Sequence, residues 1–137
     1  MEAITLFSLV THSGAYKDWP LKTPLLLNGQ PTLLAIPGFQ MLHQFQLQSG
    51  DYLLITDWDC PFEEATEFLL ISSDFKITAR KKLGAPYVSF LLDTVEVLNN
   101  NQLKVTIFEN DHFLLTIKPP NLLKSKTNIS LARIWWF

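Results

Sequence analysis

The sequence lacks the features that indicate a disulfide framework, binding to a polyanion or insertion into a membrane. It contains one cysteine, Cys60, so no disulfide can form within the chain, and we expect a reducing, cytoplasmic location. There are 11 basic and 13 acidic residues, a net charge of −2, which gives no basis for binding nucleic acid or an anionic membrane. The chain shows neither the pattern of a signal peptide nor an apolar run long enough to span a membrane.

Recognised catalytic and metal-binding patterns are missing as well. There is no H-E-x-x-H or C-x-x-C motif, no G-x-S-x-G nucleophile motif and no glycine-rich phosphate loop. We therefore predict no catalytic residue, no metal site and no cofactor. The enzyme hypothesis that stays open is a small or self-processing hydrolase that uses Asp57 or Asp59 as its acid–base group.

What the sequence does have is the composition of a globular domain. Of its 137 residues, 47% are hydrophobic and 18% are charged, which favours a dense core over disorder. A chain of this length can bury most of its surface without help from a disulfide or a metal. No linker, repeat or low-complexity tract divides it, so residues 1–137 are predicted to form one domain.

The spacing of turn-forming residues predicts an all-β fold. Eight prolines and five glycines separate short runs rich in leucine, isoleucine, valine, phenylalanine and threonine, which is typical of many short strands. About ten strands in so short a chain must stack as an antiparallel β-sandwich or close as a flattened barrel. The first of them is apolar on both faces and is predicted to lie centrally. The predicted strands cover 4–10, 25–27, 32–36, 40–48, 52–57, 66–72, 75–82, 87–98, 103–109, 113–118 and 129–137.

Two turns and one sheet edge can be placed from local chemistry. Asn28-Gly29 and Asn110-Asp111 are predicted to be tight hairpin turns, because such residues accept positive φ angles. Pro31 lacks an N–H donor, which places its strand at the edge of a sheet.

The segment from Asp57 to Glu64 holds the densest group of acidic side chains. An aspartate, an early proline and two glutamates are typical of the start of a helix, so at most one short helix is predicted near 60–66. The spacing does not match a calcium-binding loop. We predict instead that this segment binds a basic region of another protein through Asp57, Trp58, Asp59, Glu63 and Glu64.

A histidine and a tryptophan are the other candidates. Strand alternation puts Met41, His43 and Phe45 on one face, where His43 is either a core histidine or a polar group inside a pocket. In the last predicted strand, alternation directs Trp135 toward the core, and a partner or dimer surface is the alternative.

The leading functional hypothesis is a non-catalytic, cytosolic protein-interaction module, such as a small inhibitor or an immunity-type protein. It follows from the missing catalytic motifs, the acidic segment and the aromatic residues of the last strand. The alternative is a β-barrel that binds a small apolar ligand, which an internal cavity of a few hundred Å³ would favour. The sequence leaves homo-oligomerisation open.

Overall fold

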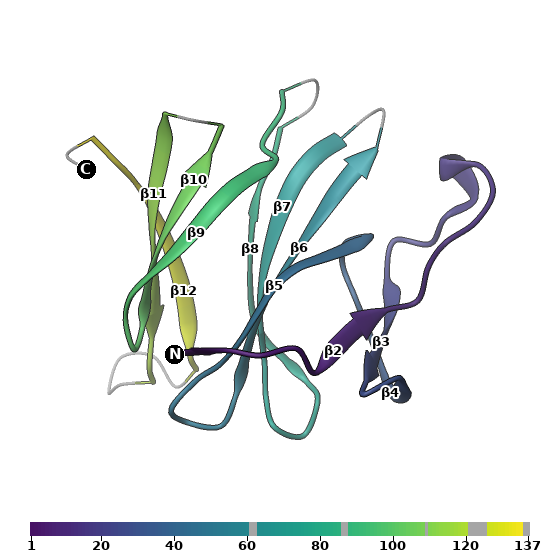
Figure 1. Cartoon of the computed structure of the whole chain (residues 1–137), viewed down its shortest axis with the longest axis horizontal. Coiled ribbons are helices and arrows are strands. Elements are labelled where there is room, and N and C mark those ends of the chain that lie inside the picture. The colour runs from purple at the N-terminus through teal and green to yellow at the C-terminus, as the bar shows by residue number, and fades with distance from the viewer. Residues whose placement is uncertain (61–62, 86–87, 109, 121–125, 136–137) are drawn as a thin grey trace.

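The computed structural model describes residues 1–60, 63–85, 88–108, 110–120 and 126–135, with the backbone alone at residues 16, 59, 60 and 63 (Figure 1). This part of the chain holds twelve β-strands and one turn of 3₁₀ helix, Tyr16–Asp18. Every pair of neighbouring strands is antiparallel, which confirms the predicted fold class. No described helix is long and apolar enough to cross a membrane.

The strands form three sheets. The central sheet has the order β1-β5-β6-β7-β8 and comprises β1 (Glu2–Ala3), β5 (Gln40–Gln46), β6 (Tyr52–Cys60), β7 (Glu63–Ile71) and β8 (Ile77–Leu83). A four-stranded sheet of order β12-β11-β10-β9 comprises β9 (Leu92–Asn99), β10 (Gln102–Ile107), β11 (Asp111–Lys118) and β12 (Asn128–Ile134). A small sheet of order β2-β3-β4 comprises β2 (Phe7–Leu9), β3 (Thr23–Leu27) and β4 (Gln30–Ile36).

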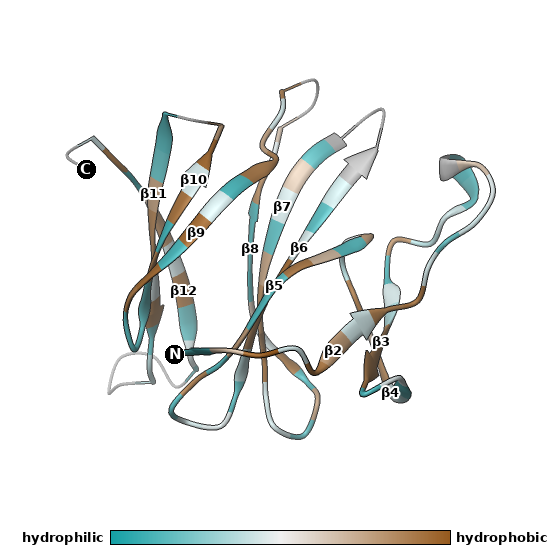
Figure 2. Ribbon diagram, viewed as in Figure 1, coloured by the Kyte–Doolittle hydropathy of each residue, from teal (hydrophilic) through white to brown (hydrophobic). Residues whose placement is uncertain are grey.

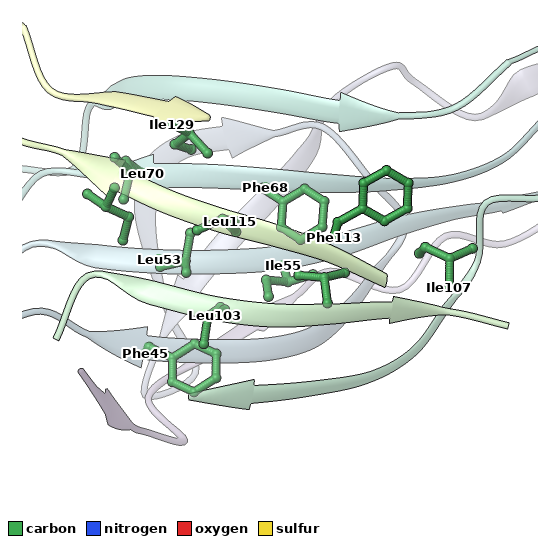
Figure 3. Close-up of a cluster of buried hydrophobic side chains, with 12 residues drawn as sticks. Phe45, Leu53, Ile55, Phe68, Leu70, Leu103, Ile107, Phe113, Leu115 and Ile129 are labelled. Carbon is green, nitrogen blue, oxygen red and sulfur yellow. The ribbon is translucent and has the colours of Figure 1, made fainter. Parts of the chain in front are cut away.

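The central sheet is covered on both faces. Along β6, Leu53 and Ile55 face the four-stranded sheet, whereas Leu54 faces the small sheet. A strand buried on both sides needs apolar residues at every position, which explains the continuous apolar runs of β6 and β7. Figure 2 shows hydrophobic residues recurring along strands of all three sheets. Figure 3 shows the larger core, enclosed by the central and four-stranded sheets, with Phe45, Phe68, Leu103, Leu115 and Ile129 among its members.

Among the described strands, the two larger sheets are in edge contact at β8 and β12, and on the other side the Met1 ammonium donates a hydrogen bond to Asn100 Oδ1 at 3.3 Å. β8 packs beside β12, and the strand orders then place β9 on the same side as β1 and β5. In Figure 1 the central sheet stands between the other two. The fold is therefore a layered sandwich whose two larger sheets pack together at one margin, while no described strands pair across the other.

The start of the chain departs from the prediction of one central strand over 4–10. It forms two short strands in different sheets, β1 paired with β5 and β2 paired with β3. Both are edge strands. Met1 packs against the larger core, whereas Ile4 and Phe7 pack in the smaller one. The segment is apolar on both sides because it crosses between two layers, not because it lies in the middle of a sheet.

The helix expected near 60–66 is not formed by the described residues of that segment. β6 and β7 pair continuously from Tyr52 opposite Ile71 to Cys60 opposite Glu63, and residues 61–62 lie outside the described residues. A local helix start competes here with a long antiparallel ladder that already satisfies the backbone N–H and C=O groups. The ladder therefore overrides the local helix signal.

The first predicted hairpin turn is confirmed and the second is shifted. Asn28 and Gly29 both have positive φ angles, 50° and 79°, between β3 and β4. The predicted Asn110-Asp111 turn is wrong in its position, because Asp111 already pairs within β11. The turn precedes it and includes Phe108, which takes a positive φ of 53°.

Candidate ligand-binding groove

A half-open groove of about 370 Å³ lies where the two larger sheets separate. Its walls come from three extended segments, namely residues 3–5, residues 41–45 of β5, and Val95 with Val97 of β9. Among the described strands β9 pairs with β10 alone, so no ladder closes this side of the sandwich. The groove is thus a consequence of the sheet topology.

Two valines of β9 give the groove an apolar wall. Val95 lies opposite Val105 in the ladder and Val97 lies opposite Leu103, and both partners are fully buried. Cross-strand neighbours share a face, so the two valines point to the core side of the sheet. Val97 is nevertheless partly exposed, which places it at the mouth of the groove.

His43 supplies the imidazole of the groove. A β-bulge between Met41 and His43 shifts the register of β5 against β6. Met41 consequently packs in the smaller core and Phe45 in the larger one, so the single shared face predicted for these residues is wrong in part. The His43 ring lies nearly parallel to that of Phe45, with centroids 6.3 Å apart and an interplanar angle of 12°. Burial lowers the pKa of His43, which keeps the imidazole neutral at neutral pH.

Gln44 fixes the first segment of the groove wall against β5. Its side-chain amide accepts a hydrogen bond from the Phe7 N–H at 2.7 Å and donates one to the Phe7 carbonyl at 2.9 Å. The Ile4 N–H donates to the Gln44 carbonyl at 3.1 Å. Gln44 therefore forms hydrogen bonds to both ends of the segment that connects β1 to β2.

The first two residues of the predicted acidic binding segment point inward. Asp57 and Trp58 are both buried, and Asp57 lies opposite Thr66 on the side of the larger core. Trp58 Nε1 donates a hydrogen bond to Glu67 Oε1 at 3.0 Å, and its ring meets that of Phe39 edge to face, with centroids 4.7 Å apart. A partner protein could touch these two side chains only after a local opening of the sandwich.

The other three predicted residues belong to the β6–β7 hairpin. Asp59 pairs with Glu64 across the ladder, and the Glu64 carboxylate accepts a hydrogen bond from the Ser89 hydroxyl at 2.9 Å. The side chains of Asp59 and Glu63 lie outside the described part of the structure. None of the hairpin's described side chains lines the groove, so a binding role for this segment stays a separate prediction.

Trp135 does not face the core. β12 ends at Ile134, and the next residue, Trp135, is 82% exposed, so its predicted burial is wrong. The alternation on which that prediction depended ends where the strand ends. The Arg133 guanidinium lies over the Trp135 ring at 5.6 Å and over the Phe113 ring at 5.1 Å. Trp136 and Phe137, in the same predicted strand, lie outside the described residues.

The groove is the feature on which a function can be argued. Among the described residues, no three histidine, cysteine, aspartate or glutamate side chains come together as metal ligands would. Sequence reasoning identified His43 but missed Val95 and Val97, although their alternation with Thr94 and Glu96 is the pattern of a half-buried strand. Comparison with models of protein families, with curated proteins and with solved structures found no match to this chain.

Proposed function

We propose that this protein binds an apolar ligand in the groove between β5 and β9 and performs no chemistry on it. The observation that carries the proposal is the groove itself, whose volume of about 370 Å³ is in the range of small-molecule sites. Its walls are largely apolar, and the removal of apolar surface from water drives binding.

The polar groups of the groove set the polarity of the ligand. The neutral imidazole of His43 can donate one hydrogen bond and accept another. The amide of Gln44 is engaged by the backbone of Phe7. A ligand that is apolar along most of its length, with one hydrogen-bonding group near His43, fits this arrangement.

Binding of the uncharged dye Nile red, whose fluorescence rises in apolar surroundings, tests the proposal. Two adjacent residues provide a matched pair, since Val97 lines the groove and is 42% exposed, whereas Leu98 does not line it and is 40% exposed. We expect Val97→Lys to weaken dye binding by about tenfold or more and Leu98→Lys to leave it unchanged. Equal effects of the two substitutions, or no binding by the wild-type protein, would contradict the proposal.

A cytoplasmic protein-interaction module is the second candidate, and the exposure of Trp135 favours it. Tryptophan and arginine are enriched among the residues that dominate interface energies, and here Trp135 lies over Arg133. The simplest partner is a second copy of the chain. Light scattering on the wild-type protein and on Trp135→Ala tests this candidate. If the wild-type protein is a dimer and Trp135→Ala is a folded monomer, the result supports a dimer interface at Trp135. If the wild-type protein is a monomer, a second copy of the chain is not the partner.

A further inference from the structure

β9 is an edge strand whose central stretch, residues 94–97, pairs in regular register with β10, whereas a register shift interrupts the ladder near each end of the strand. It has eight residues, Leu92–Asn99, and pairs with β10 alone among the described strands. The N–H and C=O groups along the outer edge of such a strand form a template for an added strand. Its sequence contains no proline, lysine or arginine, the residues that commonly protect an edge.

The other edges of the sheets are protected. β4 is an end strand, as Pro31 predicted, and Leu33 within it has a positive φ of 66°. β8 carries Arg80, Lys81 and Lys82 and packs beside β12. β1 and β2 have only two and three residues. Among the described edges, the regular stretch 94–97 of β9 is the one that combines an open side with the absence of proline, lysine and arginine, so we take it as the edge at which another chain can add.

We propose that the occupant of the groove is an extended segment of a partner protein, which adds to β9 as a further strand. This inference rests on the proposed function, since it names the occupant of the same groove. Every second side chain of the added strand would enter the groove beside Val95 and Val97. The side chains between them would lie on the outer face with Thr94 and Glu96.

The chain itself shows how an extended segment binds at this margin. β1 adds to β5 as a short strand, and the Ile4 N–H continues the pairing by donating to the Gln44 carbonyl at 3.1 Å. Ala3 and Ile4 then form part of the groove wall. Because three extended segments bound the groove, its shape suits a further extended segment better than a compact molecule.

The charges beside the groove indicate what flanks the added segment. β9 contributes Asp93 and Glu96, both exposed, and β1 contributes Glu2. Lys104 of β10 lies opposite Glu96, and the Met1 ammonium, adjacent to Glu2, donates a hydrogen bond to Asn100 Oδ1 at 3.3 Å, so these two cations offset part of the negative charge of the margin. A segment with alternating apolar residues and a lysine or arginine at its ends is complementary to this margin.

Peptides selected for binding to the whole protein test the inference. Random peptides of about ten residues, long enough to cover an edge strand, are displayed and selected on the wild-type protein, with Val97→Lys as the counter-selection. We expect enriched peptides to alternate apolar and polar residues and to carry basic ends. They should displace Nile red and should bind Leu21→Lys, a substitution at an exposed residue outside the strands, as tightly as the wild type. A thermal melt of each variant shows that the protein is folded.

Backbone methylation separates strand addition from simple burial of side chains. N-methyl groups on alternate amides of an enriched peptide remove the donors along one edge at a time. Methylation along the edge that pairs with β9 should weaken binding by about tenfold or more, whereas methylation along the other edge should have little effect.

The outcomes distinguish this inference from the proposed function on which it rests. Peptides that tolerate methylation along both edges, or that bind Val97→Lys as well as wild type, overturn strand addition. A selection that enriches no peptide, while Nile red still binds in the groove, also overturns it and leaves the proposed function standing. If neither the dye nor any peptide binds the wild-type protein, the result contradicts both strand addition and the proposed ligand-binding function.

Discussion

Arg80 covers the carboxylate of Glu67 with two hydrogen bonds, from Nε to Oε2 at 2.8 Å and from Nη2 to Oε1 at 2.6 Å. The Glu67 side chain is fully buried, whereas 48% of the Arg80 side chain is exposed. Trp58 Nε1 adds a third hydrogen bond to Oε1. A cation on the edge strand β8 thus compensates a charge on the buried strand β7, between the central sheet and the small sheet.

Replacing Arg80 with methionine should lower the free energy of unfolding by about 2–3 kcal/mol, because the buried carboxylate loses two charged donors. Urea unfolding measures the change. Lys76→Met is the control, since Lys76 pairs with Asp74 on the exposed surface and its loss should leave the midpoint unchanged. An Arg80→Met midpoint equal to that of the wild type would show that the pair does not stabilise the fold.

A β-branched residue at the second position of the Asn28-Gly29 turn should lower the stability of the protein. Gly29 has a φ of 79°, and a Cβ there would meet no atom within 4 Å, so any cost comes from the backbone conformation. Gly29→Val should destabilise the protein by more than about 1 kcal/mol. Gly29→Asn should cost much less, because asparagine accepts positive φ. Superimposable urea curves for the two variants would be evidence against the turn.

Replacing Trp58 with alanine should destabilise the protein much more than replacing Trp135 with alanine. Trp58 is 6% exposed and hydrogen-bonded to Glu67, so Trp58→Ala should destabilise the protein by about 3–5 kcal/mol. Trp135 is exposed and contacts Arg133 through its ring face, an interaction of about 0.5–1 kcal/mol, so Trp135→Ala should shift the melting temperature little. Thermal melts compare the two variants. The reverse order would contradict the placement of β6 and β12.

Stability should depend on pH through His43. Burial lowers the pKa of His43 below its usual 6.5, so the unfolded chain binds more protons than the native protein once the pH falls below that value. The free energy of unfolding should therefore decline as the pH falls through 6.5 and level off below the native pKa. Asp57 shares that side of the central sheet and Glu2 lies at the groove margin, so the effect is read as the difference between wild type and His43→Gln. Identical pH profiles would contradict it.

The fold class could be predicted because its signals are local. The positive φ angles of Asn28 and Gly29 are a property of those residue types, and the alternation of short apolar runs with turn residues requires no knowledge of tertiary contacts. The helix expected after Asp59 failed for the opposite reason. The ladder that displaces it joins Tyr52 to Ile71, a pairing that no local pattern encodes.

The groove could be predicted only in part. His43 was recognised as a polar residue on an apolar strand, but the bulge after Met41 determines which core its neighbours join, and nothing in the local sequence announces that bulge. Val95 and Val97 meet residues 3–5 because β12 packs beside β8 on the far side of the sandwich. A site built by three segments so distant in sequence depends on the topology of all the strands.

Methyl-selective NMR of a leucine- and valine-labelled sample, titrated with Nile red, tests the central claim most directly. If the groove holds an apolar ligand, the methyl resonances of Val95 and Val97 should shift with one common binding curve, while those of Leu69 in the smaller core stay in place. Shifts confined to the exposed residues Leu21 and Leu33, or no shift at Val95 and Val97 at saturating dye, would contradict the claim.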